Sequence, residues 1–415
     1  MRQHLCAELV GDLVVHLTQL KLNGFRNYEE LTLDIGTGIT VFVGENAQGK
    51  SNLLEAIYLL SLTKSHRAEN DREVVCFNSD DPVSYTRILG CAMRGSGEEL
   101  RVQVDMALLA QGSSVTITTS QKILQKRIRI NGSPKKAIEA VGALSAVLFC
   151  ADDIGLVYGS PAGRRRFLDV LLAQISHGYL KHLQGYHKIL AQRNHLLRRI
   201  SDGSSDVDEL SFWDQQLCSQ GAKVVWERTM AIDQLAPLVS EIHSTIAPDG
   251  PTLTIGYSSS VDRCDSLDRT ADQFFARLER SRERELRSRV TLVGPHRDDV
   301  HFLIDGKSIN RYGSRGQARS AVLSLRFSEA RLIAKINCDE PILLLDDALA
   351  ELDLGRQLRV LDLARASNQV LLTAVDAEHG IGLENLAVEW YWVKNGSLTR
   401  RRLDEMIPDR SGAQG

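Results

Sequence analysis

Residues 44–51 constrain this chain more than any other stretch. Two glycines are separated by four residues and followed by lysine and serine, which is the pattern of a phosphate-binding loop. The loop and the residue after it comprise Gly44, Glu45, Asn46, Ala47, Gln48, Gly49, Lys50, Ser51 and Asn52. The pattern predicts a strand before the loop and a helix after it, and therefore an α/β fold.

The flanks of the loop have the required periodicity. Residues 40–43 are a short apolar, β-branched run, and residues 51–62 carry apolar side chains at helical spacing. In this arrangement backbone N–H groups point at phosphate oxygens, Lys50 reaches the terminal phosphates and Ser51 ligates Mg²⁺. The alternative is a glycine-rich turn that only caps a helix. Pattern and context together favour a nucleotide site.

Composition sets broad limits. The 415 residues, 43% hydrophobic and 25% charged, suffice for a large core and more than one lobe. No apolar run reaches the length of a membrane span, and no signal peptide is evident, so we expect a cytoplasmic protein without membrane contact. The net charge of −3 means that nucleic-acid binding would need local patches. The seven scattered cysteines are expected to be reduced.

The first third of the chain is predicted to be strands around one long helix. Two strands are expected over residues 16–35, joined by a turn near Asn23 and Gly24, with further strands at 85–93, 100–108 and 115–119. A basic segment with a hairpin turn at Asn131 and Gly132 follows, and it is either a solvated ribbon edge or a nucleic-acid contact. Its cations are Lys122, Lys126, Arg127, Arg129, Lys135 and Lys136.

From Ser160 onward the pattern becomes helical. Apolar residues recur at helical spacing over 164–175 and 179–200, and a polar link at 202–206 precedes a second long helix over 210–246. Two long helices joined by a short link predict an antiparallel hairpin, which we interpret as an inserted arm. Its basic residues form either the solvated face of the helices or DNA contacts. They are Arg164, Arg165, Arg166, Arg193, Arg198 and Arg199.

Beyond the arm, a strand at 252–257 and a helix at 271–289 lead to a polar loop at 294–299. Residues 300–304 are expected to form a hairpin around Asp305 and Gly306. A Ser-x-Gly-Gln turn made by Ser314, Gly316 and Gln317 then precedes a strongly periodic helix. Such a turn offers a hydroxyl, N–H groups and the positive end of a helix dipole to a phosphate. Taken alone, it is more typical of a helix cap.

An acidic strand end completes the pattern. Residues 341–347 are an apolar run ending in Asp346 and Asp347, the form of a Walker B segment. Asp346 would hold Mg²⁺, and Asp347 would orient or deprotonate the attacking water. A helix is expected to begin at residues 350–353. Thr373 ends one more buried strand and is a candidate sensor of the γ-phosphate, although a strand-end Thr is commonly structural.

The order of these motifs resembles the RecF family of bacterial recombination mediators, over roughly residues 16–400. The resemblance rests on Phe25-Arg26-Asn27-Tyr28, residues 44–52, Ser160-Pro161 with residues 164–169, residues 294–299, residues 314–317, and Leu345-Asp346-Asp347. It implies an α/β fold: a P-loop ABC-type ATPase head with mixed sheets, assembled from N- and C-terminal segments, with an inserted helical arm. The expected boundaries are 1–13 (mobile extension), 14–159 (head), 160–289 (arm), 290–403 (head) and 404–415 (tail).

The same resemblance implies a function and further site residues. It implies ATP-dependent homodimerisation, in which Ser314 and Gly316 of one subunit meet the γ-phosphate held by Lys50 of the other. It implies binding of single- and double-stranded DNA at gaps and junctions. RecR, and RecO as a further candidate, would be partners in loading RecA during repair and the SOS response. Arg26 and Asn46 would touch the nucleotide, with Arg67 close by.

Two positions depart from the wider group of ABC ATPases. Many of these have Glu after the Walker B Asp and His at the position of Thr373, whereas this chain has Asp347 and Thr373. The shorter carboxylate places its base less favourably, so we expect slow hydrolysis that serves as a switch. A small-molecule P-loop kinase and a scaffold that does not hydrolyse nucleotide are the alternatives. The kinase reading leaves the Ser314 turn and the arm without a purpose.

Overall fold

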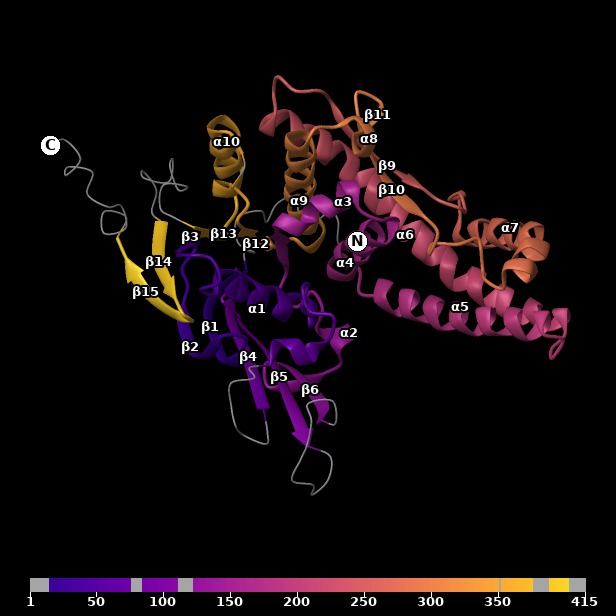
Figure 1. Ribbon diagram of the computed structural model, residues 1–415, viewed down its shortest axis with the longest axis horizontal. Coiled ribbons are helices and arrows are strands. Elements are labelled where there is room, and N and C mark those ends of the chain that lie inside the picture. The colour runs from indigo at the N-terminus through magenta and orange to yellow at the C-terminus, as the bar shows by residue number, and fades with distance from the viewer. Residues whose placement is uncertain (1–14, 76–83, 111–121, 351, 376–387, 403–415) are drawn as a thin grey trace. The chain divides into compact units, whose positions relative to one another are not determined.

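The computed structural model describes residues 15–75, 84–110, 122–350, 352–375 and 388–402 (Figure 1). The chain divides into two compact units. The first comprises Met1–Asp153 and Glu329–Gly415, and the second comprises Ile154–Ser328. The expected boundaries at 160 and 290 differ from this division, because the strands and the Ser314 turn after residue 290 group with the helical arm. None of the helices in the described ranges is long and apolar enough to cross a membrane.

A largely parallel sheet carries the phosphate loop in the first unit. Its described strands run in the order β15-β14-β3-β13-β12-β8, and only the β14–β15 pair is antiparallel. The strands are β3 (Gly38–Val43), β8 (Ala146–Phe149), β12 (Ile342–Asp346), β13 (Gln369–Ala374), β14 (Val388–Lys394) and β15 (Ser397–Arg401). The central strands β3, β12 and β13 are apolar and almost entirely buried, as is typical of parallel strands.

A second sheet of the first unit is antiparallel. Its order is β2-β1-β4-β5-β6-β7 among the described strands. They are β1 (His16–Phe25), β2 (Tyr28–Asp34), β4 (Ser84–Met93), β5 (Glu99–Ala110), β6 (Lys122–Ile130) and β7 (Ser133–Lys135). Asn131 and Gly132 both have positive φ, of 49° and 80°, so the predicted hairpin turn is confirmed.

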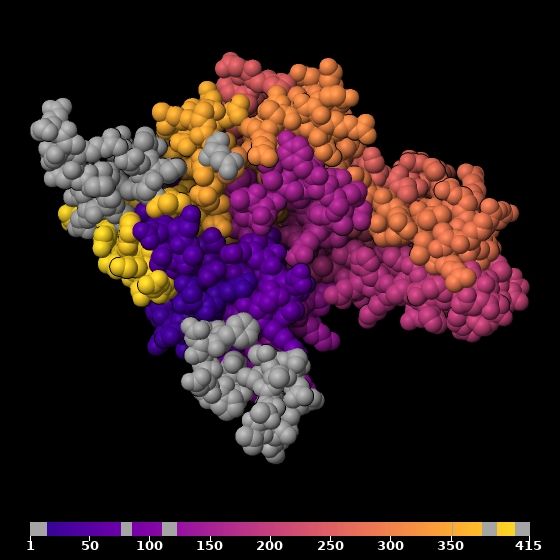
Figure 2. Space-filling view, viewed as in Figure 1, coloured from indigo at the N-terminus to yellow at the C-terminus, as the bar shows by residue number. Residues whose placement is uncertain are grey.

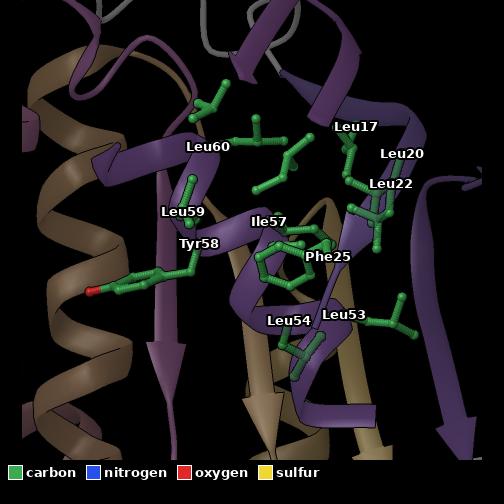
Figure 3. Packing of buried hydrophobic residues seen from close by; sticks show 14 of the residues in the cluster. Leu17, Leu20, Leu22, Phe25, Leu53, Leu54, Ile57, Tyr58, Leu59 and Leu60 are labelled. Atoms are coloured by element: carbon green, nitrogen blue, oxygen red, sulfur yellow. The ribbon is translucent and has the colours of Figure 1, made fainter. Parts of the chain in front are cut away.

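Helix α1 (Lys50–Leu62) contacts strands of both sheets, and its side chains are buried on nearly every face. Leu53, Leu54 and Ile57 belong to one core cluster with Leu20, Leu22 and Phe25 of β1 (Figure 3). A helix that is apolar all round must be covered on all sides. The phosphate loop therefore leads into a helix that is buried on nearly every face.

The second unit is mainly helical. Its elements are α3 (Gly155–Tyr158), α4 (Pro161–Ile175), α5 (Tyr179–Ser201), α6 (Leu210–Ile246), β9 (Leu253–Ser258), α7 (Leu267–Ser288), β10 (Asp299–Ile304), β11 (Lys307–Ser308) and α8 (Ile309–Tyr312). Helix α9 (Arg315–Asn337) begins in this unit. The predicted hairpin of α5 and α6 is confirmed, and α7 packs against both helices. Gly221 permits this packing, because a Cβ there would lie 2.4 Å from Phe274 and 3.0 Å from Tyr186.

Shorter elements complete the fold. Helix α2 (Ala137–Ala140) and α10 (Leu354–Arg365) lie in the first unit, with a 3₁₀ turn at Asp71–Val74, and a second 3₁₀ turn, Ala151–Ile154, spans the boundary between the units. The second unit has a further 3₁₀ turn at Val207–Glu209.

Several local predictions need correction. The turn between β1 and β2 lies at Arg26 and Asn27 rather than at Asn23 and Gly24, because Arg26 adopts φ 52° and Asn23 still pairs with Glu30. Helix α10 begins at Leu354, since Asp353 is its N-cap and accepts a hydrogen bond from the Arg356 backbone. Cys338 is disulfide-bonded, so the expectation that all cysteines are reduced is wrong for this residue. The predicted strand at 115–119 and the two chain ends lie outside the described residues.

Candidate nucleotide site

The phosphate loop requires glycine at both ends for steric reasons. Gly49 caps α1 with φ 114°, and a Cβ there would lie 2.5 Å from Nδ2 of Asn27. A Cβ on Gly44 would lie 2.4 Å from the carbonyl oxygen of Val393 in β14. Both glycines therefore let the loop pass close to neighbouring strands and leave its N–H groups at the start of α1, where anions bind.

Lys50 folds back over its own loop. Its ammonium group donates hydrogen bonds to the carbonyl oxygens of Gly44 and, at 2.7 Å, Glu45. Burial lowers the pKa of Lys50, and the negative charges of Asp347 and Asp346 oppose that shift. The lysine thus lies between the loop and the two acids, where it can meet a negatively charged ligand.

The predicted Walker A and Walker B residues meet at one point. Ser51 donates its hydroxyl to Oδ1 of Asp346 at 2.8 Å, and Thr373 donates to the same oxygen at 2.7 Å. Strands β3, β13 and β12 are adjacent and parallel, with Thr373 opposite both Phe42 and Asp346. Their carboxyl ends therefore lie at one edge of the sheet, which is where ligands bind in such sheets.

Asp347 has a strained backbone. Its φ is 52°, in the left-handed region that few residues other than glycine, Asn and Asp adopt. Its backbone N–H donates to Oγ1 of Thr373 at 2.9 Å. Thr373 is only 3% exposed, and its hydroxyl connects the two acids. Its predicted role as a γ-phosphate sensor stays a prediction.

The tip of the β1–β2 hairpin makes hydrogen bonds to the phosphate loop. Asn27 Nδ2 donates to the Gln48 carbonyl oxygen at 3.0 Å, and the Tyr28 hydroxyl donates to that of Gly49 at 3.0 Å. On another side, the Asn395 backbone N–H donates to Oε1 of Gln48 at 2.8 Å. Sequence reasoning gave Asn27, Tyr28 and Asn395 no role, although Asn27 and Tyr28 lie in one of the motifs that carry the family resemblance.

The remaining candidates of the first unit are placed around the loop. Arg26 makes a two-point ion pair with buried Glu55, at 2.6 and 3.1 Å, and donates to the Glu73 carbonyl oxygen. Arg67 is exposed and lies 3.5 Å from Oδ1 of Asn52. Asn46 is exposed at the turn of the loop. Nucleotide contact by these residues stays a prediction.

The Ser314 turn lies in the second unit and caps α9. The Ser314 hydroxyl accepts a hydrogen bond from the Gln317 backbone N–H at 3.2 Å, and Gln317 Oε1 accepts one from the Ser314 N–H at 2.8 Å. This reciprocal pair of hydrogen bonds is a capping box. Within this unit, the Ser314 turn therefore acts as the N-terminal cap of α9. Ser314 is exposed, and its phosphate contact stays a prediction.

The basic clusters separate into structural and exposed residues. Arg193 is fully buried and pairs with Asp214 and Glu285 at 2.6 and 2.7 Å, so it is wrong to count it as a DNA contact. Arg164 pairs with Asp299 and is 7% exposed. Lys126 pairs with Asp71, and Arg129 with Asp105. The exposed remainder consists of Arg127, Lys135, Lys136, Arg166, Arg198 and Arg199.

Chemically, this edge of the sheet combines an ammonium group, loop N–H groups, a hydroxyl and two carboxylates. The described residues contain no group of three or more His, Cys, Asp or Glu side chains that could hold a metal ion. A Mg²⁺ site of this class needs only one or two carboxylates, because substrate phosphates supply other ligands. The Ser51 and Asp346 oxygens suit such a cation.

Comparisons with known proteins identify the family of this chain. The family described as "RecF/RecN/SMC N terminal domain" matches residues 16–394. A Roseiflexus castenholzii protein named "DNA replication and repair protein RecF" is 40% identical over 375 residues, covering 88% of this chain and 94% of its own. A Bacillus subtilis protein of the same name is 37% identical over 390 residues, covering 93% of this chain and 100% of its own.

Solved structures also resemble this chain. A structure titled "recombination mediator protein RecF-ATPrS in RecFOR pathway" has a TM-score of 0.81 and 28% identity, covering 94% of this chain and 99% of that chain. An Smc head bound to part of ScpA is 14% identical with a TM-score of 0.52, and so shares the fold alone. With the phosphate loop and the acidic strand end meeting as described, the chain belongs to the RecF family of ABC/SMC-type ATPases.

Proposed function

We propose that this protein is an ATP-gated DNA-binding protein of recombinational repair. The observation that carries the proposal is the convergence of Ser51 and Thr373 on Oδ1 of Asp346, at 2.8 and 2.7 Å. The Ser51 hydroxyl follows the loop lysine, and the Asp346 carboxylate ends β12, which is separated from β3 by β13. Together they form the oxygen pair that a nucleotide–Mg²⁺ site needs. The names of the relatives, which refer to replication, repair and recombination, point the same way.

The site residues divide the work of binding and hydrolysis. The loop N–H groups and Lys50 bind the phosphates, and Ser51 and Asp346 hold Mg²⁺. A cation held by Ser51 and Asp346 would supply positive charge to offset the negative charge that develops during phosphoryl transfer. Asp347 accepts a proton from the attacking water or orients it. Because its carboxylate is short and its backbone is fixed at φ 52°, hydrolysis is slow and serves to end the bound state.

The second half of the composite site comes from another copy of the chain. Ser314, Gly316 and Gln317 offer a hydroxyl and N–H groups at the start of α9, a 23-residue helix whose dipole favours an anion. ATP held by one subunit would meet this turn of the other, so that ATP binding drives dimerisation. The closed dimer binds DNA at gaps and junctions in the cytoplasm. RecR, with RecO, then assists the loading of RecA and the SOS response.

Molecular mass by light scattering tests this proposal. The wild type is measured without nucleotide and with ATP and Mg²⁺, and binding of a fluorescent ATP analogue is measured in parallel. We expect ATP to double the mass. Ser314→Arg blocks the turn, and Ser314→Asp keeps an N-cap acceptor but adds a negative charge that repels the γ-phosphate. Both variants should bind nucleotide and stay monomeric. Ser244→Arg, at an exposed serine of α6, is the matched control and should dimerise.

The outcomes separate the alternatives. A mass that does not respond to ATP, together with wild-type behaviour of Ser314→Asp, would reduce the turn to a helix cap and contradict the proposal. A phosphorylated small-molecule product would indicate the kinase alternative. Turnover that persists in Asp347→Asn would remove the assigned base, and the absence of any turnover in the wild type would favour a scaffold.

A further inference from the structure

Helix α5 carries no acidic residue. It spans 23 residues, Tyr179–Ser201, in a chain where 53 of 415 residues are Asp or Glu. Six of its exposed polar residues are spaced by three, four, four, three and four positions, so these six lie on one face of the helix. These residues, which we call the α5 stripe, are Lys181, Gln184, Lys188, Gln192, His195 and Arg199.

The opposite face of α5 accounts for its packing. Tyr179, Tyr186, Leu196 and Leu197 are buried in the arm core. Buried Arg193 forms ion pairs with Asp214 and Glu285 and donates a hydrogen bond to Thr291. The fold therefore packs the inner face, and within the described residues the stripe's structural contact is the hydrogen bond from Arg199 to the Ser204 carbonyl oxygen at 3.1 Å. Figure 2 shows α5 open to solvent along the margin of the arm.

Carboxylates that flank α5 in the fold form ion pairs with other residues. At its start, Asp169 pairs with Arg228 at 2.7 Å, and at its end Asp202 pairs with Arg289 at 3.2 Å. On the neighbouring α6, residues 210–226 contain one acid, Asp214, which is fully buried and pairs with Arg193 and Arg282. Gln220 of α6 faces His182 of α5 at 3.1 Å. No ion pair therefore neutralises the stripe within the described residues.

Helix α7 gives the contrasting pattern. It is equally exposed on its outer side, but its arginines alternate with Glu and Asp and form ion pairs. Arg287 pairs with Glu283 at 3.1 Å, and Arg277 pairs with Asp262 at 3.2 Å. Such self-paired charge is typical of a solvated helix face. The stripe on α5 lacks this compensation, although both helices belong to the same unit.

We propose that the α5 stripe binds the sugar–phosphate backbone of duplex DNA. The proposal rests on the function proposed above and assigns the surface that meets the duplex. Residues 181–199 extend about 27 Å along the helix, most of one turn of a duplex. Lys and Arg neutralise phosphates, and Gln side chains donate hydrogen bonds to them.

The chemistry of the stripe favours DNA over a protein partner. Protein interfaces gain their affinity from apolar and aromatic anchors and are depleted in Lys. The stripe has two lysines and no large apolar residue. It also has no carboxylate that would repel a polyanion. A duplex backbone is therefore the partner whose repeating negative charge matches a row of cations on a rigid helix.

Binding of a fluorescent duplex with ATP and Mg²⁺, measured across a salt series, tests the proposal. One variant combines Lys181→Gln, Lys188→Gln and Arg199→Gln. Its matched control combines Arg280→Gln, Arg284→Gln and Arg287→Gln on the exposed side of α7, which removes the same number of positive charges. Binding of the ATP analogue, ATP-dependent mass and thermal melting are recorded for each protein.

We expect the α5 variant to lose at least about tenfold in affinity at ~0.1 M salt, with the slope of log K against log salt smaller by roughly two to three. The α7 variant should keep most of its affinity. Equal losses in the two variants would show a general charge effect and overturn the proposal, as would wild-type binding by the α5 variant. If wild-type protein dimerises on ATP but binds no duplex, the proposed DNA function fails as well.

Discussion

Thr373 Oγ1 lies 2.7 Å from Oδ1 of Asp346 and accepts a hydrogen bond from the Asp347 N–H at 2.9 Å. One buried hydroxyl thus fixes the side chain of the first acid and the backbone of the second. Thr373 is therefore a positioning residue for the acidic pair, whatever it contacts in the nucleotide complex.

Thr373→Val tests this positioning role. The change keeps the shape of the side chain but removes the hydroxyl, so Asp346 loses a donor and the Asp347 N–H loses its acceptor. We expect turnover to fall by about 10- to 100-fold, with nucleotide binding nearly unchanged. Thr40→Val is the control, because the buried Thr40 hydroxyl has no hydrogen-bond partner in the described part of the chain. Steady-state ATPase assays that gave equal rates for both variants would contradict the assignment.

Gly49→Ala tests the steric requirement of the loop. An alanine at φ 114° is strained, and its Cβ would lie 2.5 Å from Asn27. We expect a loss of stability of roughly 1–3 kcal/mol and a large loss of nucleotide affinity, because the hairpin tip and the loop must separate. Gly97→Ala has a positive φ of 80° without any neighbour within 4 Å, so it adds strain alone and should leave affinity intact. Chemical denaturation and titration with an ATP analogue measure the two effects.

The local patterns predicted the strand, loop and helix around Lys50 and the apolar strand ending in Asp346. Both are short stretches whose residues signal their own structure. They also assigned Ser51 and Asp346 to one Mg²⁺ site, which requires that the two stretches meet. The hydrogen bonds from Asn27, Tyr28 and Asn395 to the loop were not predictable, since they join residues 21 to 347 positions apart.

Charge patterns predicted less. Arg193 and Arg198 lie five positions apart on α5 and look alike in sequence, yet one is fully buried and the other is exposed. Their difference depends on Asp214 and Glu285, which come from α6 and α7. A run of basic residues therefore cannot be ranked as DNA contacts until its carboxylate partners are placed.

Arg193→Met tests the buried ion pair. The variant fills a similar volume but leaves Asp214 and Glu285 as buried carboxylates, of which only Asp214 keeps another ion pair, to Arg282. We expect a loss of about 3–5 kcal/mol in the free energy of unfolding. Arg198→Met removes an exposed charge from the same helix and should change it by less than about 0.5 kcal/mol. Urea denaturation measures the free energy of unfolding of both variants. Equal losses would contradict a special contribution of the buried ion pair to stability.

His296 gives a pH-dependent prediction. Its Nε2 lies 3.0 Å from the Thr291 carbonyl oxygen and therefore donates, while Nδ1 accepts from the Tyr186 hydroxyl at 2.6 Å. Burial, together with the charges of Arg297, Arg165 and His187, lowers the pKa of His296 to about 4. In the unfolded chain His296 binds a proton below about pH 6.5, whereas in the folded chain it binds one only near pH 4. Its contribution to the free energy of unfolding is therefore complete above about pH 6.5 and is lost as the pH falls toward 4. Denaturation at several pH values should show the wild type losing about 2–3 kcal/mol more than His296→Asn between pH 7.5 and 4.5. The exposed His177→Asn variant should follow the wild type, and parallel curves for all three proteins would contradict the assignment.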